Sequence, residues 1–298
     1  MDAGTKALWE PWRDLCVFDT QINYALDDDP HSTNTYQDYV DWSHNMIGDY
    51  PSQYDEWTAL TPDQLISRYT GPDGFKINKE LLEDGEVAYY EFHGFDKLEG
   101  PKRSAWIKDL RSFVEQKNEQ FYAILEESAE DWYAKLQKIQ QEAKWKRVAI
   151  EAILLRKQIT DRKAAEKDRR VGQLPLFRKE KWLVGETTRQ WNVRQGDILK
   201  FHEKHFISTT RIDYLAPDHR QHFHSTDVEK HVVLKIHSRK QGVCISSESV
   251  YAGEEEVLFP IGTRFKVLKI QFDARGRTGS QTSVRGDNLY LILEVTEV

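Results

Sequence analysis

Residues 249–265 of this 298-residue chain read SVYAGEEEVLFPIGTRF, and this stretch decides the fold of the C-terminal half. Three consecutive glutamates, Glu254 to Glu256, lead into the apolar run Val257-Leu258-Phe259. The tripeptide Pro260-Ile261-Gly262 is typical of a turn, and residues 264–272 then alternate between polar and apolar side chains. The pattern predicts two strands joined by a tight turn, with carboxylates at the start of the first strand.

Further strands are expected on both sides of this stretch. Five more segments have the alternating or β-branched composition of strands, and glycines separate several of them: residues 181–186, 206–209, 231–236, 243–246 and 289–295. The C-terminal part is therefore predicted to be a sheet.

Residues 61–171 have the pattern of helices instead. Thr61 followed by proline is a helix start, because a hydroxyl caps the first turn and proline fits its first position. Two short helices are expected between Thr61 and Gly85. Neither proline nor glycine occurs between Pro101 and Gly172, where apolar residues recur at three- and four-residue intervals. This stretch predicts one long helix or a pair of helices.

Residues 1–60 are rich in Trp, Tyr and Asp. They are expected to form short helices and loops around buried aromatic side chains, with Pro11, Pro30 and Pro51 as breaks. The predicted fold class is α+β, a helical N-terminal half followed by a mixed or antiparallel β-sandwich-like core. The expected division is a region of unknown role over residues 1–60, a helical region over 61–171 and a β core over 172–298.

The charge is divided unevenly along the chain. The net charge of -7 combines -17 over residues 1–134, +7 over residues 135–170 and +3 over residues 171–298. Such asymmetry bears on partners and not on fold. The basic segment could contact nucleic acid, or the acidic first half could cover it.

Composition limits the classes of protein and of site. A hydrophobic content of 39% with nine tryptophans is that of a globular chain. Cys16 and Cys244 are far apart and give no disulfide framework, which fits a reducing cytoplasm. No apolar run reaches the roughly 18 residues needed to cross a membrane, and no secretory signal is visible. His219, His222 and His224 lack a nearby Cys or carboxylate cluster, so no metal site is expected.

Two groups of polar residues stand at the ends of predicted strands. Because alternate strand residues share a face, Glu254 and Glu256 are expected to point the same way, with Glu255 turned out. Paired carboxylates occur at catalytic sites, although a triple acid is also typical of a solvated loop. The second group, Ser208-Thr209-Thr210, closes an apolar run, and such hydroxyls often bond only to nearby backbone. Neither motif is specific alone.

The order and spacing of the motifs are more specific than the motifs themselves. Ser208 and Glu256 are 48 positions apart, and the full series is Gly196-Asp197-Ile198, then residues 206–209, 254–259 and 262–265. In this layout the chain resembles the arginine–serine–glutamate class of mono-ADP-ribosyltransferases, enzymes that move ADP-ribose from NAD to a target. Residues 69–81, with Tyr-Thr-Gly and Ile-Asn, are similar to the element that precedes the catalytic sheet of that family. The resemblance implies a transferase core over residues 172–298, with NAD as substrate and no metal.

The resemblance also implies roles for individual residues. Glu256 matches the catalytic glutamate, which hydrogen-bonds the nicotinamide-side ribose and stabilises the oxocarbenium ion as nicotinamide leaves. Glu254 matches the glutamate that orients or deprotonates the acceptor, and in this family it favours a guanidinium acceptor. Ser208 matches the serine that orients the catalytic glutamate and lines the nicotinamide pocket, and Thr209 and Thr210 extend that strand. Residues 249–253 occupy the place of the family's target-recognition turn.

One expected residue is missing from its place. The family's arginine clamps the phosphate and ribose of NAD and usually lies in an aromatic-Arg-Gly sequence before the serine strand. Here Val184, followed by Gly185, stands at that position. Three explanations are open: Arg178 is the equivalent residue, Arg189 or Arg194 reaches in from the next loop, or the arginine has been replaced. The Leu-Val-Gly-Glu context favours replacement, which would leave a weak or inactive enzyme.

The resulting expectation is an ADP-ribosylating toxin or effector that is cytoplasmic or delivered into the cytoplasm of a target cell. Its partners would be NAD and a macromolecule: a protein arginine first, RNA or DNA bound through the basic segment 135–181 second. An inhibitory partner such as an antitoxin is a further expectation. The alternatives are an NAD glycohydrolase, which uses water as acceptor, and a catalytically impaired transferase-fold binding protein.

Overall fold

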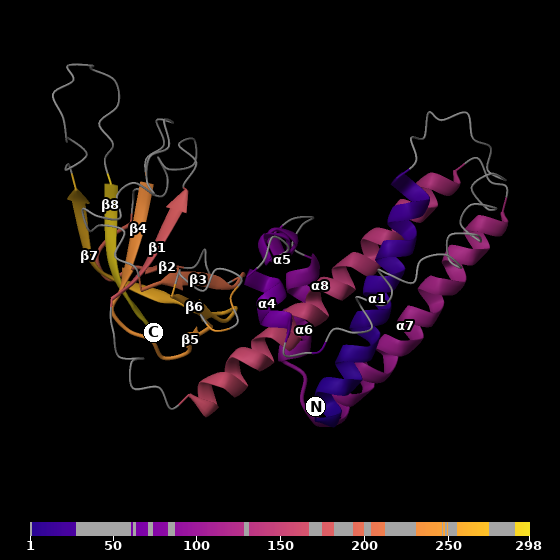
Figure 1. The fold of residues 1–298 in the computed structure, drawn as a ribbon, viewed down its shortest axis with the longest axis horizontal. Helices are drawn as coiled ribbons and strands as arrows, with labels where there is room; N and C mark the ends of the chain where they lie inside the picture. The colour runs from indigo at the N-terminus through magenta and orange to yellow at the C-terminus, as the bar shows by residue number, and fades with distance from the viewer. Residues whose placement is uncertain are drawn as a thin grey trace, which may run out of the picture. The chain divides into compact units, whose positions relative to one another are not determined.

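The computed structural model of the chain describes residues 2–27, 61, 64–70, 74–82, 87–127, 131–166, 175–181, 193–199, 204–211, 231–245, 247, 249, 255–273 and 290–298. These residues form two compact units, Met1–Lys157 and Gln158–Val298. The first unit is helical and the second carries the sheet (Figure 1). The predicted order, a helical part followed by a sheet, is confirmed.

Three long helices dominate the helical unit: α1 (Ala3–Asp27), α7 (Gly100–Glu126) and α8 (Trp132–Ala165). α1 packs against α7, where the rings of Phe18 and Phe121 lie 6.0 Å apart. At the surface of the same pair, the guanidinium of Arg111 donates to Glu10 at 2.7 Å. The two long helices confirm the prediction of a helix pair between Pro101 and Gly172.

The start of the chain differs from the prediction. Within the described residues 2–27, a single helix of 25 residues is present in place of short helices and loops, and it runs through Pro11. Proline inside a helix removes a hydrogen bond and costs about 3 kcal/mol. Burial of Trp9, Trp12 and Phe18 on this helix offsets that cost, and their burial was predicted. Pro30 and Pro51 lie outside the described residues.

The break between α7 and α8 needs neither proline nor glycine. Glu127 leaves the helix with an extended backbone, at φ -81° and ψ 118°. Residues 126–131 include four acids, Glu126, Glu127, Glu130 and Asp131. Negative charge is unfavourable at a helix C-terminus and favourable at an N-terminus, so this cluster ends one helix and starts the next.

Among the described residues three short helices are present, of which the first two were predicted. They are α4 (Leu65–Thr70), α5 (Gly74–Leu82) and α6 (Val87–Asp96). Ahead of α4, the side chain of Gln64 accepts the backbone N–H of Thr61 at 2.8 Å, a capping-box contact. Asn78 donates to the hydroxyl of Tyr69 at 2.9 Å and so joins α5 to α4.

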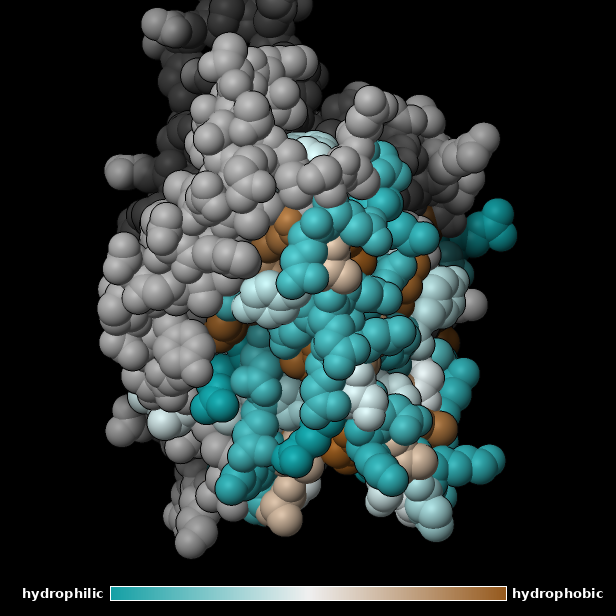
Figure 2. Space-filling model, turned by 90° about the vertical axis from the view of Figure 1, so that its right-hand side faces the viewer, coloured by the Kyte–Doolittle hydropathy of each residue, from teal (hydrophilic) through white to brown (hydrophobic). Residues whose placement is uncertain are grey.

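Basic side chains of α8 are paired with acids of the same unit. These ion pairs include Lys135–Glu127, Lys144–Glu80, Lys146–Glu91, Arg147–Asp19, Arg156–Asp96 and Lys157–Asp2. The acidic first half therefore neutralises much of the basic segment. The face of this unit that Figure 2 presents is largely hydrophilic.

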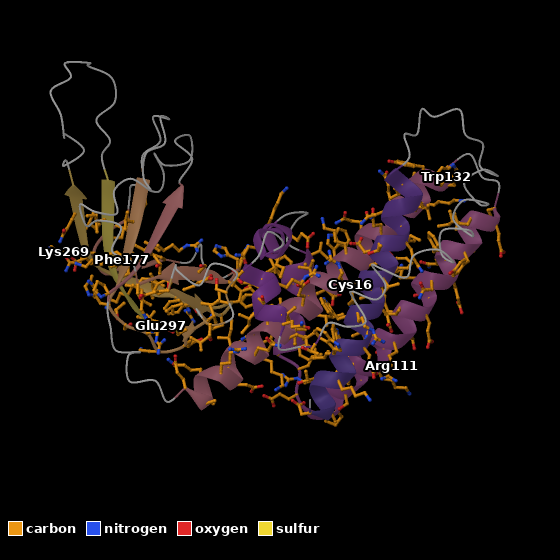
Figure 3. All side chains as sticks on the ribbon, viewed as in Figure 1. Cys16, Arg111, Trp132, Phe177, Lys269 and Glu297 are labelled. Atoms are coloured by element: carbon orange, nitrogen blue, oxygen red, sulfur yellow. The ribbon has the colours of Figure 1, made fainter. Side chains whose placement is uncertain are left out.

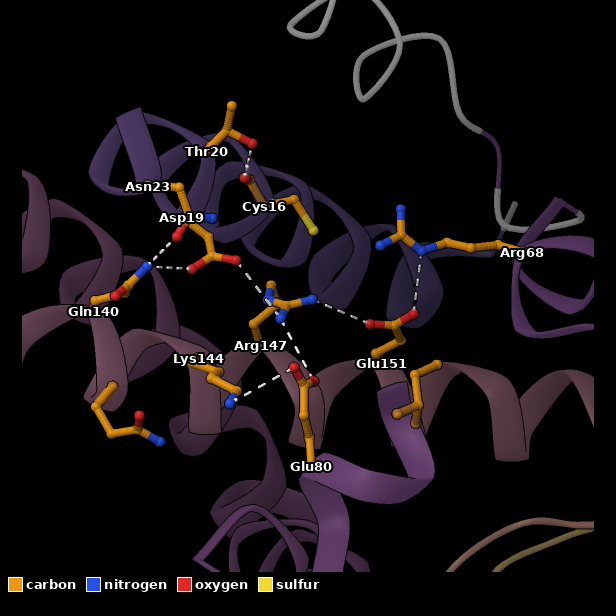
Figure 4. Close-up of a pocket in the computed structure, with 12 residues that line it drawn as sticks. Cys16, Asp19, Thr20, Asn23, Arg68, Glu80, Gln140, Lys144, Arg147 and Glu151 are labelled. Carbon is orange, nitrogen blue, oxygen red and sulfur yellow. Dashed lines mark hydrogen bonds and ion pairs between the residues drawn. The ribbon is translucent and has the colours of Figure 1, made fainter. Parts of the chain in front are cut away.

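Arg147 lies at the centre of a polar network between helices. Its guanidinium is within 3.7 Å of Asp19 on α1, Glu80 on α5 and Glu151 on α8 itself. The network borders a polar cavity of about 450 Å³ (Figure 4). Cys16 lies inside the same unit (Figure 3), and burial raises the pKa of its thiol. In the described part of the chain, every helix is too short or too polar to cross a membrane.

The second unit contains one sheet with the strand order β2-β7-β8-β4-β1-β3-β6-β5. The β4–β8 pair is parallel and the other neighbours are antiparallel. The strands are β1 (Leu176–Lys181), β2 (Ile198–Leu199), β3 (Ile207–Thr210), β4 (His231–Ile236), β5 (Val243–Cys244), β6 (Glu256–Phe259), β7 (Phe265–Asp273) and β8 (Tyr290–Glu297). This is a mixed sheet, and a sandwich-like second layer stays a prediction.

Two strands differ from their prediction. β1 begins at Leu176, five residues before the predicted strand 181–186, of which residues 182–186 lie outside the described residues. The apolar pair Leu176-Phe177 is buried, and burial of this pair places the strand earlier. β2 was not predicted, because a strand of two residues carries no readable alternation.

One face of the sheet forms a continuous apolar core. Twelve buried side chains from seven strands and their neighbours belong to it, among them Ile207, Leu234, Val257, Phe259 and Leu293. The alternate residues of β6, Glu256 and Leu258, are consequently on the opposite face. The core therefore fixes which way the functional side chains of β3 and β6 point.

Candidate active site

Ser208 on β3 and Glu256 on β6 meet across neighbouring strands. The register pairs Thr210 with Glu256 and Ser208 with Leu258, so the two polar residues are diagonal neighbours on one face. The hydroxyl of Ser208 donates to Oε1 of Glu256. The glutamate is only 5% exposed, although it begins its strand. A buried carboxylate needs such partners, because an unpaired buried charge is costly.

The two threonines of the same strand are buried and have different surroundings. The hydroxyl of Thr209 donates to the carbonyl of Val257 at 2.7 Å, which is a backbone contact across the β3–β6 pair. Thr210 lies directly opposite Glu256 in the register. Thr209 therefore stabilises the strand pair, and Thr210 borders the carboxylate.

Arg178 reaches this pair from β1. Its guanidinium Nη1 donates to the backbone carbonyl of Ser208 at 2.7 Å. The register explains the approach, because Phe177 of β1 lies opposite Thr210 of β3. Arg178, Ser208 and Glu256 are thus joined by two consecutive contacts, although they come from three strands.

The other arginine candidates are placed differently. Val184, Gly185 and Arg189 lie outside the described residues. Arg194 is exposed in the turn before β2, at the other edge of the sheet, where its backbone N–H donates to the carboxylate of Asp197. Among the described residues, Arg178 is the sequence-predicted arginine that the fold brings to Ser208.

A second hydroxyl contacts the carboxylate of Glu256. Ser249 lies before β6 and donates to Oε2 of Glu256 at 3.1 Å. Its backbone N–H donates to the carbonyl of Ile245 at 2.8 Å, and the N–H of Ile245 donates to the carbonyl of Glu256 at 3.0 Å. The sequence pattern did not single out Ser249, because a serine in a loop carries no signal of its own.

The entry into β6 explains why only one glutamate of the triplet is buried. Glu255 is exposed and has a φ of 47°, in the left-handed region that side chains other than glycine rarely adopt. The strand begins at the next residue, Glu256. The prediction that Glu255 is turned out is confirmed, although strand alternation does not extend to it. Glu254 lies outside the described residues, so its orientation stays a prediction.

The exit from β6 is a rigid turn, as predicted. Gly262 has a φ of 90°, and the hydroxyl of Thr263 donates to the carbonyl of Pro260 at 2.7 Å. At the end of the same strand, a Cβ placed on Gly242 would lie 2.8 Å from the ring of Phe259. These contacts hold β6 firmly between its neighbours.

The end of α8 supports the strand next to β6. Glu166 accepts from the guanidinium of Arg239 at 2.8 Å and from the N–H of Cys244 at 3.5 Å, while Lys163 donates to the carbonyl of Gly242 at 3.1 Å. Burial opposes the charge of Glu166, but the hydrogen bonds and charges of Arg239 and Lys163 outweigh it, so its pKa lies below the ordinary value.

A metal centre has no candidate in the described part of the chain, where no group of three or more His, Cys, Asp or Glu is placed to hold an ion. His219, His222 and His224 lie outside it. The chemistry available to the described residues is that of a fixed carboxylate between two hydroxyls, with a guanidinium nearby.

Comparison with known proteins gives a family match for the sheet unit. Residues 180–296 match the model of the ADP-ribosyltransferase exoenzymes. This span contains Ser208 and Glu256 and begins two residues after Arg178. No curated protein matches the chain.

Three solved structures illustrate what the fold is similar to. ADP-ribosyltransferase HopU1 of Pseudomonas syringae is 16% identical with a TM-score of 0.36, over 51% of this chain and 56% of HopU1, so the chain spans about half of that protein. Plx2a, an ADP-ribosyltransferase toxin from Paenibacillus larvae, is 16% identical with a TM-score of 0.39, over 82% of this chain and 90% of Plx2a. The ATR domain of Salmonella SpvB is 12% identical with a TM-score of 0.40, over 79% of this chain and 98% of that domain.

Proposed function

We propose that this chain is a mono-ADP-ribosyltransferase that cleaves NAD and transfers ADP-ribose to a macromolecular acceptor. The observation that carries the proposal is the convergence of Arg178, Ser208 and Glu256 from three strands. In this proposal Arg178 takes the place of the family's arginine, beside the serine and glutamate that the resemblance assigns to Ser208 and Glu256. The family match over residues 180–296, which begins after Arg178, supports transferase activity.

Glu256 is proposed to stabilise the positive charge that develops on the ribose. When the bond between the ribose C1′ and the nicotinamide nitrogen breaks, the ribose becomes an oxocarbenium-like cation and nicotinamide leaves as a neutral molecule. A carboxylate held in advance beside that cation lowers the barrier, because it needs no reorganisation during the reaction. The hydroxyl of Ser208 fixes the carboxylate, so its role is orientation.

Arg178 is proposed to bind the phosphate side of NAD, in place of the explanation that the arginine has been replaced. A guanidinium is suited to phosphate, because its planar donors bind two oxygens at once. The guanidinium of Arg178 lies beside the Ser208–Glu256 pair, where Nη1 donates to the carbonyl of Ser208. With an arginine in place, the proposal of an impaired enzyme loses its main support.

The acceptor is proposed to be a protein arginine, with Glu254 as the residue that orients or deprotonates it. A nucleic-acid acceptor bound through residues 135–181 is less well supported, because several cations of α8 are already paired with acids. Forming a phosphate contact would require these pairs to break. Action as a toxin inside a target cell, and control by an inhibitory partner, belong to the same proposal.

The test is incubation of the purified protein with NAD labelled in the adenylate part, with and without a cell lysate. The wild type should release nicotinamide and label a macromolecule, and treatment with protease or nuclease identifies its class. Glu256→Gln should lower the rate at least 100-fold, since it removes the charge and keeps the shape. The matched control is Glu255→Gln, at the exposed neighbouring position. Its rate should stay within about threefold of the wild-type rate.

Three outcomes separate the candidate functions. Label on a macromolecule supports the transferase. Free ADP-ribose as the sole product, with lysate present, supports an NAD glycohydrolase. Neither product from folded wild-type protein contradicts the proposal and leaves the non-catalytic binding protein.

A further inference from the structure

We propose that Ser249 is a positioning residue for Glu256: its hydroxyl holds the second carboxylate oxygen of that residue. The inference rests on the proposed function, in which Glu256 acts on the ribose. It adds a residue that the sequence motif does not contain.

The two oxygens of Glu256 have different donors. Ser208 on β3 donates to Oε1, and Ser249 donates to Oε2 at 3.1 Å. Both Glu256 and Ser249 are largely buried, at 5% and 9% exposure. A single donor leaves the carboxyl group free to rotate about its terminal torsion, which is intrinsically broad. Two donors from opposite sides define the plane of the group.

The backbone of Ser249 is linked to the backbone of Glu256 through Ile245. The N–H of Ser249 donates to the carbonyl of Ile245 at 2.8 Å, and the N–H of Ile245 donates to the carbonyl of Glu256 at 3.0 Å. Together with the side-chain contact these bonds close a ring between residues 245–249 and the start of β6. Ile245 is fully buried, which anchors the ring.

The ring makes the orientation of the Glu256 carboxylate depend on Ser249. Catalytic groups need orientation within a few tenths of an ångström, so a small displacement of the carboxylate is sufficient to lower the rate.

The first experiment measures NAD hydrolysis without acceptor for three variants. Ser249→Ala should lower kcat about tenfold, the effect of one lost hydrogen bond to a charged group, with KM changed less than threefold. Ser249→Thr keeps the hydroxyl and should recover most of that loss. Lys266→Ala, at an exposed position of β7 away from Glu256, is the control, and its kcat should stay within twofold of the wild type.

The second measurement is the pH dependence of kcat. If Ser249 had only a structural role, its loss would not shift this pH profile. Donors to a carboxylate favour its charged form, so loss of the Ser249 donor should move the acid limb of kcat to higher pH. Among the residues that the structure describes, the charged or titratable groups near Glu256 include Arg178 on β1, Arg211 after β3, Cys244 on β5 and the neighbouring Glu255. Ser249→Ala changes none of them.

An activity-independent readout separates the two proposals. In protein labelled with ¹³C at glutamate carboxyls, the Glu256 signal is assigned with Glu256→Gln, and its titration should move to higher pH in Ser249→Ala. If the Glu256 titration moves in Ser249→Ala but the wild type shows no activity, the proposed function is overturned while the contact between Ser249 and Glu256 is supported. An unmoved titration, unchanged kcat in Ser249→Ala, or a loss that Ser249→Thr does not recover overturns the role of Ser249.

Discussion

At the scale of single residues, the site depends on side chains whose partners come from other strands. Glu256 is buried, yet it lies beside the exposed Glu255 in a triplet of identical residues. What distinguishes them is the left-handed backbone of Glu255 and the two hydroxyls that reach Glu256. Composition alone could not rank the three glutamates. The family resemblance assigned the role beside Ser208 to Glu256, and the structure places Glu256 in contact with that serine.

A substitution of Arg178 tests its proposed role in NAD binding. Arg178→Lys keeps the charge and loses the planar fork, so kcat/KM for NAD should fall about 100-fold, which corresponds to roughly 2.7 kcal/mol of transition-state stabilisation. Val184→Arg is the matched variant, and it should not raise the rate. A steady-state assay of nicotinamide release measures both. A gain in Val184→Arg with little loss in Arg178→Lys would show that the arginine had been replaced at position 184.

At the scale of elements, α8 holds the helical unit together through charge as well as apolar packing. Its buried apolar residues, such as Leu136, Val148 and Leu155, pack within the unit, and Arg147 links it to α1 and α5. Glu151 is 1% exposed, and its oxygens lie 3.6–3.7 Å from Arg68 and Arg147. A carboxylate buried to this degree depends on those two cations.

Arg147→Met tests this dependence. It leaves Glu151 and Glu80 with one fewer cation, so the free energy of unfolding should fall by about 3 kcal/mol. The additional change Glu151→Met should recover part of the loss, because it removes the buried unpaired charge. Lys138→Met, at an exposed position of the same helix, should change the free energy of unfolding by no more than about 0.5 kcal/mol. Denaturant unfolding measures the free energy of unfolding of all three variants. If the two changes in the double variant destabilised the protein additively, the coupling between Arg147 and Glu151 would be contradicted.

At the scale of the whole molecule, the division of charge along the sequence has a structural counterpart. The basic segment is the helix α8, and the acidic residues before it supply many of its ion pairs. In the sheet unit, acids also fix loops: Glu297 accepts the backbone N–H groups of Lys240 and Gln241. Stability should therefore depend on pH through buried carboxylates in both units.

Glu166 shows in which direction stability should change with pH. Its folded-state pKa lies below the ordinary value of 4.5, so its contribution is present above pH 4.5 and is lost as the pH falls through the folded pKa. Glu166→Gln should lower the free energy of unfolding by about 2 kcal/mol at pH 7. The difference from wild type should shrink toward zero in acid. A difference that stays constant from pH 7 to pH 3 would show that charge is not its cause.

The amino-acid sequence by itself determined the elements with strong periodicity and the spacing of the motif. β4 and β6 have the predicted bounds, and the α7–α8 pair follows from apolar spacing, since both patterns are local. The tertiary structure decided the length of α1, the early start of β1 and the partners of Glu256. Burial of Trp12 overrides the local preference of Pro11, and sheet pairing brings Arg178 to Ser208. Interactions between distant segments depend on strand order and register, which no local pattern encodes.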